Sequence, residues 1–212
     1  MSYKINKITF ENDKFSNNLK QIKDCPKKLY YIGNINILNT NCISIVGKRE
    51  ATPKGKYYSY LLAKKYAAKG FTIVSGLAKG IDQFAHIGAL SVNGKTIAVL
   101  GNGLSKIYPE ENTKLAKEII KKNGLIITEY ETNEKPNTQN FPKRNRIISG
   151  LSISTIIIEA DEISGSLITG RYAIDQNREL YTIPWKLNLE KNFQSGCNLL
   201  IKEGITPITK IW

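Results

Sequence analysis

The chain has 212 residues, 41% of them hydrophobic, and its 31 Lys and Arg against 18 Asp and Glu give a net charge of +13 with histidine neutral. This length suits one domain with a sizeable core, and this hydrophobic content excludes a disordered polycation. No apolar run approaches the roughly 20 residues that span a membrane. The charge favours an anionic partner, of which nucleic acid is the commonest large one, although it also fits plain solubility.

The few cysteines and the single histidine argue against disulfide, metal and catalytic-triad chemistry. Cys25, Cys42 and Cys197 are odd in number and too scattered for a disulfide framework or a CxxC metal site. The first residues, MSYKINKITFENDKF, contain neither the apolar stretch nor the cleavage site of a secretion signal. We therefore expect a cytoplasmic protein with reduced thiols, no membrane association, no metal and no cofactor. His86 lies among apolar residues of a predicted helix, so we expect a packing or helix-surface role for it rather than a place in a catalytic triad.

Residues 1–41 are polar, with no clear hydrophobic period except at their end, PKKLYYIGNINIL, and we interpret them as a short N-terminal extension. From Cys42 onward, short β-branched runs alternate with helical stretches. The predicted strands are 43–47, 71–75, 96–100, 125–129, 155–159 and 180–183. The predicted helices are 54–69, 81–90, 111–122, 143–151, 166–177 and 198–203, with an irregular loop at 136–141. This alternation indicates a sheet covered on both faces, so residues 42–212 are predicted to form a doubly wound, mostly parallel, extended Rossmann-like α/β domain.

Glycines and small polar residues follow four of the predicted strands. The segments are Gly47-Lys48-Arg49, Ser75-Gly76 through Asp82, Gly101-Asn102-Gly103 running to Tyr108-Pro109, and Ser164-Gly165-Ser166 through Thr169. Ligands of doubly wound folds lie outside the carboxyl ends of the strands, where glycines let the backbone approach closely and free helix N–H groups bind phosphate. Tight turns need glycine in any case. Four such loops at one sheet edge nevertheless favour a surface for phosphate or sugar-phosphate.

Established nucleotide fingerprints are missing from these loops. Nothing matches GxxxxGK[ST], and Gly47 stands after the first predicted strand without the partners of a GxGxxG motif. An ordinary NAD enzyme or ATPase is therefore disfavoured.

A basic cluster with an aromatic neighbour lies in the sequence FPKRNR, which contains Phe141, Lys143, Arg144, Asn145 and Arg146. Closely spaced cations neutralise phosphates, and an aromatic ring can stack on an unpaired base. The alternative is a solvated charge run with Phe141 in the core. If the cluster binds DNA, replacing Lys143 or Arg146 by Ala should weaken binding and leave the fold intact.

Several of these motifs resemble the DprA family, also called Smf. The resemblance covers about residues 15–204 and is carried above all by SGLAKGID, FPKRNRIISGLS and SGSLITGRYA. It implies a Rossmann-type core that binds single-stranded DNA without strong sequence preference, forms dimers and loads the RecA recombinase during natural transformation. The family is not known for catalysis.

The resemblance also implies a set of binding residues, with Phe141 as the base-contacting aromatic. The phosphate pocket falls on Gly47, Arg49, Ser75, Gly76, Gly80, Lys143, Asn145, Arg146, Gly165, Ser166 and Thr169, to which we add Lys48 and Arg144 as neighbouring cations. Lys48 departs from the family, which more often has Ser at this position. Trp185 stands where members usually carry Gly.

Two other functions stay open from the residues alone. One is an enzyme that acts on a small nucleotide, similar to the phosphoribohydrolases, with Glu129 or Glu159 as the acid, although the PGGxGTxxE signature of that group is absent. Glu159 could equally be an N-cap or an ion-pair partner of the basic helix. The other is a Rossmann-type module that senses a nucleotide.

Overall fold

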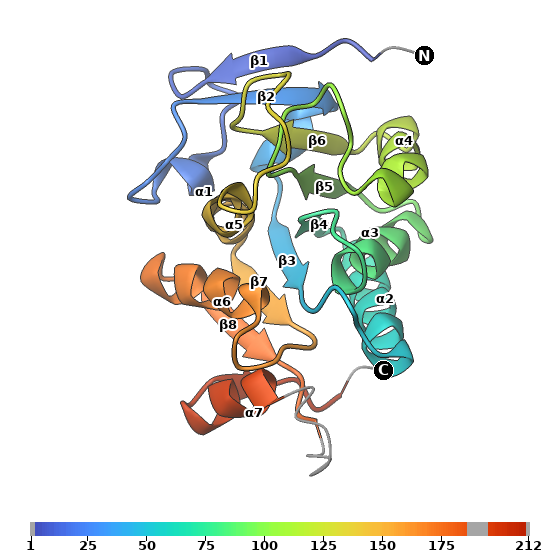
Figure 1. Cartoon of the computed structure of the whole chain (residues 1–212), viewed down its shortest axis with the longest axis vertical. Coiled ribbons are helices and arrows are strands. Elements are labelled where there is room, and N and C mark those ends of the chain that lie inside the picture. The colour runs from blue at the N-terminus through green and yellow to red at the C-terminus, as the bar shows by residue number, and fades with distance from the viewer. Residues whose placement is uncertain (1–2, 186–194, 211–212) are drawn as a thin grey trace.

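The computed structural model describes residues 3–185 and 195–210. Within them the strands form a single sheet in the order β1-β2-β6-β5-β4-β3-β7-β8-β9 (Figure 1). The strands are β1 Asn6–Thr9, β2 Lys28–Gly33, β3 Cys42–Val46, β4 Thr72–Ser75, β5 Thr96–Val99, β6 Leu125–Thr128, β7 Ser154–Ile157, β8 Glu179–Thr182 and β9 Thr206–Pro207. The helices are α1 Asn17–Lys20, α2 Pro53–Ala68, α3 Ile81–Leu90, α4 Thr113–Lys121, α5 Asn140–Leu151, α6 Gly165–Asp175 and α7 Ser195–Lys202, with 3₁₀ turns η1 Ile35–Asn39 and η2 Glu110–Asn112.

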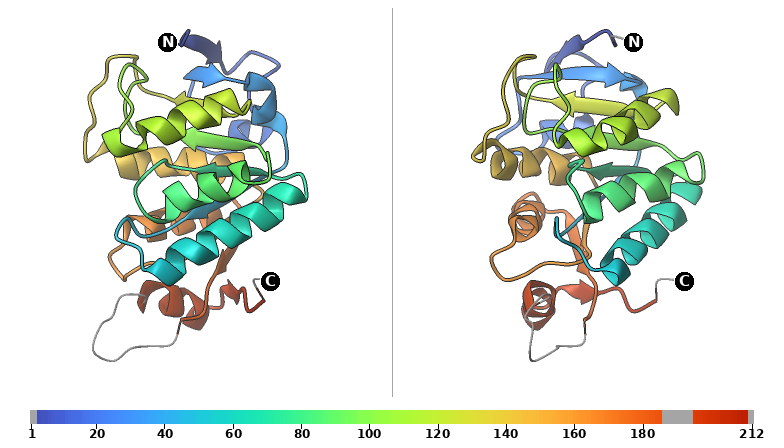
Figure 2. Two further views of the ribbon diagram at one scale, coloured as in Figure 1. Left: turned by 90° about the vertical axis from the view of Figure 1, so that its right-hand side faces the viewer. Right: turned by 45° about the vertical axis from the view of Figure 1, so that its right-hand side comes forward.

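The predicted mostly parallel α/β fold is confirmed. The strands from β3 to β9 pair in parallel with one another. β3 to β7 are short and wholly buried because helices cover both faces: α2, α3 and α4 pack on one face, and α1, α5 and α6 on the other (Figure 2). Each predicted strand and helix after Cys42 is present, with its ends displaced by a few residues at most.

The first forty residues contribute to the same sheet. β1 and β2 are antiparallel to each other, and β2 is antiparallel to β6, where Tyr31 lies opposite Ile127. The sequence predicts no strand here, because β1 and β2 are short and only Leu29 and Ile32 of β2 are buried. The segment interpreted as an extension thus forms one edge of the sheet.

The direction of winding reverses beside β3. This strand pairs with β4 on one side and with β7 on the other, and α5 makes the crossover from β6 to β7. At such a reversal, neighbouring loops leave the sheet toward opposite faces and open a crevice at its carboxyl edge. The loop from β3 to α2 and the loop from β7 to α6 flank this crevice.

Local signals explain how the helices beside the crevice begin and end. Thr52 caps α2, its Oγ1 accepting from the Gly55 amide at 3.0 Å, and Pro53 occupies the first turn, where its missing N–H costs nothing. Gly70 follows α2 with a φ of +89°, as expected for a glycine that ends a helix. α5 begins at Asn140, before the predicted 143, so Phe141 belongs to its first turn rather than to a loop.

His86 has the packing role expected for it. It is fully buried on α3, and its Nδ1 lies 2.7 Å from Thr96 Oγ1. Burial lowers the pKa of its imidazole to about 3, with the positive charge of Arg144 acting in the same direction. Among residues 3–185 and 195–210, none of the helices has both the length and the apolar character needed to cross a lipid bilayer.

Candidate nucleic-acid interface

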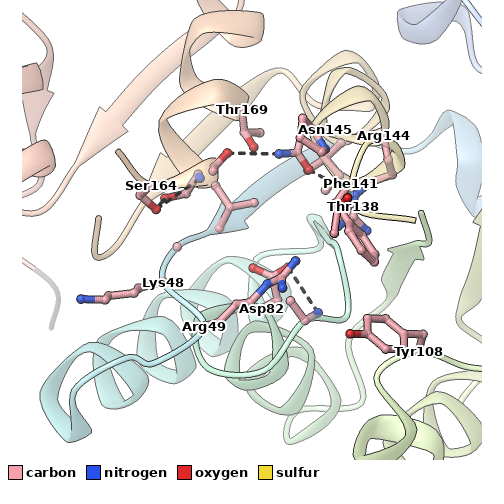
Figure 3. A pocket seen from close by; sticks show the side chains of 17 residues that line it. Lys48, Arg49, Asp82, Tyr108, Thr138, Phe141, Arg144, Asn145, Ser164 and Thr169 are labelled. Carbon is pink, nitrogen blue, oxygen red and sulfur yellow. Dashed lines mark hydrogen bonds between the residues drawn. The ribbon is translucent and has the colours of Figure 1, made fainter. Parts of the chain in front are cut away.

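A pocket of about 460 Å³ opens at the crevice beside β3 (Figure 3). Its walls come from the loop after β3, the start of α5 and the start of α6, with additional residues from the loops after β4 and β5. The lining residues are Val46, Gly47, Lys48, Arg49, Ala78, Asp82, Tyr108, Thr138, Phe141, Pro142, Arg144, Asn145, Ile148, Ser164, Gly165, Ser166 and Thr169. The glycine loops and the FPKRNR segment therefore meet in one place.

The start of α6 supplies hydrogen-bond donors to this pocket. Ser164 is the N-cap, and its Oγ accepts from the Ser166 amide at 3.4 Å. Asn145 on α5 donates from Nδ2 to the Gly165 carbonyl at 3.2 Å, which ties the two helices together (Figure 3). The first-turn N–H groups of a helix have no partner within the helix and carry partial positive charge, so this end of α6 suits an anion.

Two other helices that begin at this edge, α2 and α3, already have a carboxylate hydrogen-bonded at their starts. Glu159, fully buried, accepts at Oε2 from the Thr52 amide at 3.0 Å at the start of α2. Asp82 in the first turn of α3 accepts at Oδ2 from the Gly76 amide at 3.0 Å and from the Ala78 amide at 3.4 Å. An anion at either place would displace a buried carboxylate. The start of α6 is therefore the favoured anion site among these three helices.

Arg144 joins the ends of two strands to α5. Its side chain is 5% exposed, and Nη1 donates to the Gly76 carbonyl at 2.9 Å and to the Val99 carbonyl. Burial lowers the pKa of this guanidinium to about 10, partly offset by the Asp82 carboxylate. Burial likewise raises the pKa of Asp82, and the Arg144 charge opposes that rise. Arg144 lines the pocket, but the hydrogen bonds of its Nη1 go to backbone carbonyls of the pocket wall and hold that wall in place.

An aromatic pair forms another wall. The rings of Phe141 and Tyr108 are stacked with centroids 5.6 Å apart and planes 28° from parallel. The Arg49 guanidinium lies 5.2 Å from the centroid of Phe141. Phe141 also packs on Gly101, where a Cβ atom would lie 2.7 Å from its Cδ1, so this position needs glycine. Tyr108 is 40% exposed and presents a surface on which a base could stack.

The predicted cations have different environments. Arg49 is exposed, and within the described part of the chain it forms no ion pair. Lys48 lies 2.7 Å from Asp161 Oδ2, and Lys143 is exposed but outside the pocket lining. Arg146 is buried in a two-pronged pair with Glu129, at 2.5 Å from Oε1 and 2.7 Å from Oε2.

Most of the predicted site residues line the pocket. They are Gly47, Lys48, Arg49, Phe141, Arg144, Asn145, Gly165, Ser166 and Thr169, and Gly76 lines a smaller hollow that adjoins it. Ser75, Gly80, Lys143 and Arg146 do not line it.

Two of these four have evident roles in the fold. Ser75 is buried and donates from Oγ to the Ile45 carbonyl at 2.7 Å. Gly80 has a φ of +75° at the start of α3, and a Cβ there would collide with the carbonyl groups of Lys48 and Arg49.

Tyr108, Asp82 and Ser164 also line the pocket, although they belong only to the predicted glycine loops and not to the predicted binding residues. A signal existed for Tyr108, because Tyr108-Pro109 closes the glycine loop after the third predicted strand. Asp82 ends the SGLAKGID motif, and Ser164 stands directly before Gly165.

Comparison with known proteins gives the family. The model for DNA recombination-mediator protein A matches residues 6–211. The chain belongs to this family. Protein Smf of Escherichia coli (strain K12) is 40% identical to it over 187 residues, which make up 88% of this chain and 50% of that protein. The chain thus spans half the length of this relative.

Solved structures of DNA processing protein A are also similar over nearly the whole chain. That from Streptococcus pneumoniae superposes with a TM-score of 0.90 at 37% identity and covers 98% of this chain and 72% of the other. The structure from Helicobacter pylori, described for its single-stranded DNA binding mode, gives a TM-score of 0.88 at 36% identity. It covers 99% of this chain and 93% of the other. The resemblance seen in the motifs is therefore confirmed, and with it the Rossmann-like fold of this recombination-mediator family.

Proposed function

We propose that this chain binds single-stranded DNA in the pocket beside β3 and passes the strand to the RecA recombinase. The observation that carries the proposal is the juxtaposition of an anion site at the start of α6 with the stacked Phe141 and Tyr108 rings. A single strand offers both of the groups that such a site needs, a phosphate and an unpaired base. The single-stranded DNA binding described for the Helicobacter pylori relative supports this assignment.

Within the pocket we assign the phosphate to Arg49, Asn145, Ser166, Thr169 and the first-turn N–H groups of α6. Phe141 and Tyr108 take the base. Gly47 and Gly165 let the backbone of the strand approach, since neither presents a side chain. Lys143 lies outside the lining but on the exposed surface of α5, where it can attract the strand at longer range.

The alternative is an enzyme or a sensor that binds a small nucleotide. The hydrogen bonds of the two candidate acids, Glu129 and Glu159, argue against the enzyme. Glu159 accepts hydrogen bonds from Thr52, the N-cap of α2, and Glu129 is paired with Arg146, so both candidate acids already have partners within the fold. The nucleotide-binding place of many Rossmann folds, the start of the first crossover helix, holds the Glu159 carboxylate. Titration with nucleoside monophosphates tests both alternatives, and release of free base or tight binding of one nucleotide would favour them over our proposal.

Fluorescence anisotropy with labelled oligo-dT, single-stranded and in duplex, across a salt series tests the proposal. Three to five phosphate contacts predict a log–log salt slope of about −2 to −3.5, because each contact on a single strand contributes roughly −0.7. Single strands should bind more tightly than duplex of the same length. Equal or tighter binding to duplex, or none at low salt, would refute it.

The transfer to RecA and the dimeric state need their own measurements. A strand-exchange assay in which the DNA is first covered by single-strand-binding protein should show faster RecA filament growth when this chain is present. Light scattering should give the mass of two copies. Participation in natural transformation, as the resemblance implies, would appear as a loss of transformants on deletion of the gene in its host.

A further inference from the structure

Helix α2 carries a concentration of positive charge but contributes no residue to the lining of the pocket. Every charged residue between Glu50 and Asp82 is a lysine, and this stretch contains the whole of α2. Helices that only need solubility commonly mix signs, because Lys and Glu one turn apart attract each other while like charges repel. α2 has no such compensation within its own sequence.

The exposed side of α2 combines these lysines with an aromatic ring. Lys54, Tyr57, Leu61 and Lys64 follow one another at three- and four-residue intervals and therefore form one row along the helix, which we call the α2 row. Lys54 and Lys64 are exposed, and Tyr57 is 55% exposed. Phosphate-neutralising charges that alternate with a stackable ring are the features that bind single strands without sequence preference.

Aromatic neighbours hold the first lysine of this row in place. The Lys54 ammonium lies 5.4 Å from the centroid of the Tyr58 ring and 5.5 Å from that of the Trp185 ring. Those two rings are 5.6 Å apart. A cation held over ring faces keeps its charge and loses freedom, so less entropy remains to be lost when it meets a phosphate.

The other lysine-rich helix provides an internal comparison. α4 carries Lys114, Lys117 and Lys121, but Glu118 lies in the same helix at four residues from Lys114 and three from Lys121. Two lysines of α4 thus have a carboxylate one turn away in the same helix, which is the arrangement of a solvated surface, whereas α2 contains no carboxylate.

The α2 row begins a few residues along the chain from the pocket. α2 begins at Pro53, directly after the loop whose Gly47, Lys48 and Arg49 line the pocket. Its 16 residues extend for about 24 Å away from the carboxyl edge of the sheet, on the outside of the molecule (Figure 2).

We propose that a single strand leaving the pocket continues along the α2 row, with phosphates at Lys54 and Lys64 and a base against Tyr57. This inference rests on the function proposed above. It assigns to α2 the second half of a longer track, so that the pocket alone holds a short oligomer and the row adds affinity only for a longer one.

Paired charge removals test it. The variant Lys54→Gln/Lys64→Gln removes two charges from the α2 row, and Lys114→Gln/Lys117→Gln removes two exposed charges from α4 as its control. Both are measured by anisotropy with oligo-dT of about 5 and about 16 nucleotides, lengths at the two ends of common single-strand site sizes. Loss of two phosphate contacts should make the salt slope for the longer oligomer shallower by about 1.4 in the α2 variant. The control should keep the parent slope, and the shorter oligomer should bind alike to all three proteins.

Equal slopes for the two variants with the longer oligomer would overturn the inference while leaving the pocket proposal standing. If the parent binds neither oligomer, the function proposed above fails instead. Photo-crosslinking with 5-iododeoxyuridine placed at successive positions of the longer oligomer gives an independent measurement. Peptides containing Tyr57 should crosslink in the parent and in Lys114→Gln/Lys117→Gln, and crosslinks that never reach α2 would also refute the track. Thermal unfolding of both variants verifies that the exposed substitutions leave the fold unchanged.

Discussion

The guanidinium of Arg146 and the carboxylate of Glu129 form a buried two-pronged pair, with Nη1 at 2.5 Å from Oε1 and Nη2 at 2.7 Å from Oε2. Their side chains are 7% and 14% exposed. The pair joins α5 to the end of β6, and Arg146 Nε donates in addition to the Asp24 carbonyl at 2.9 Å. A cation that belongs to the basic motif by sequence thus serves to fix α5 against the sheet.

Arg146→Ala should therefore destabilise the fold, contrary to the expectation from the sequence that this change leaves the fold intact. Removing one partner of a buried pair leaves the Glu129 charge uncompensated, which costs about 3–5 kcal/mol. Urea unfolding followed by circular dichroism measures the loss, and Lys143→Ala, an exposed change on the same helix, should stay within about 0.5 kcal/mol of the parent. The double variant Glu129→Leu/Arg146→Met should recover much of the stability, because it removes both charges together. A parent-like midpoint for Arg146→Ala would contradict the structural role.

Arg144 and Arg146 show which features could be predicted from the sequence and which could not. β-branched runs and helix ends located the strands and helices after Cys42, and the glycine loops located the pocket, because these signals are local. Whether a cation is free depends on partners far along the chain. Glu129 reaches Arg146 across a crossover connection, and the Gly76 carbonyl reaches Arg144 from another strand. No spacing within FPKRNR encodes those contacts.

β1 and β2 are not evident from the sequence for a related reason. β2 is short, and its place is set by pairing with β6, in which Tyr30 lies opposite Thr128. Tyr108 likewise joins the site only because the loop after β5 folds back onto the first turn of α5, where its ring meets Phe141. In both cases tertiary pairing decided the structure, and a single-sequence pattern does not contain it.

Phe141→Ala should weaken single-strand binding without changing its salt dependence. Loss of one base-stacking ring costs about 1–3 kcal/mol, and no charge is removed, so the slope of log affinity against log salt stays that of the parent. Phe141→Tyr, which keeps an aromatic face, serves as the control. Anisotropy with oligo-dT at several salt concentrations measures both quantities. Parent-like affinity in the alanine variant would show that the ring only packs against Gly101 and Tyr108.

Arg49→Gln, by contrast, should change the salt dependence of binding as well as its affinity. It removes an exposed cation from the pocket, so affinity falls and the salt slope becomes shallower by about 0.7. The Arg49 guanidinium also lies over Phe141, and the two changes should therefore not add when combined, with a coupling of about 0.5–3 kcal/mol. Strict additivity in the cycle, or an unchanged slope for Arg49→Gln, would remove Arg49 from the phosphate contacts.

The buried His86 should make the protein sensitive to mild acid. Its pKa is lowered from the ordinary 6.5 to about 3 by burial, so between these values the unfolded chain binds a proton that the folded chain does not. Stability is complete above pH 6.5 and falls as the pH is lowered toward 3. The loss should reach about 2 kcal/mol near pH 5, since each pH unit costs about 1.4 kcal/mol in this range. His86→Asn is the matched variant, because its side-chain amide can keep the contact with Thr96 Oγ1 and does not titrate. Urea unfolding at pH 7.5 and pH 5 should show a larger loss for the parent than for His86→Asn, and equal losses would mean that His86 does not control the acid response.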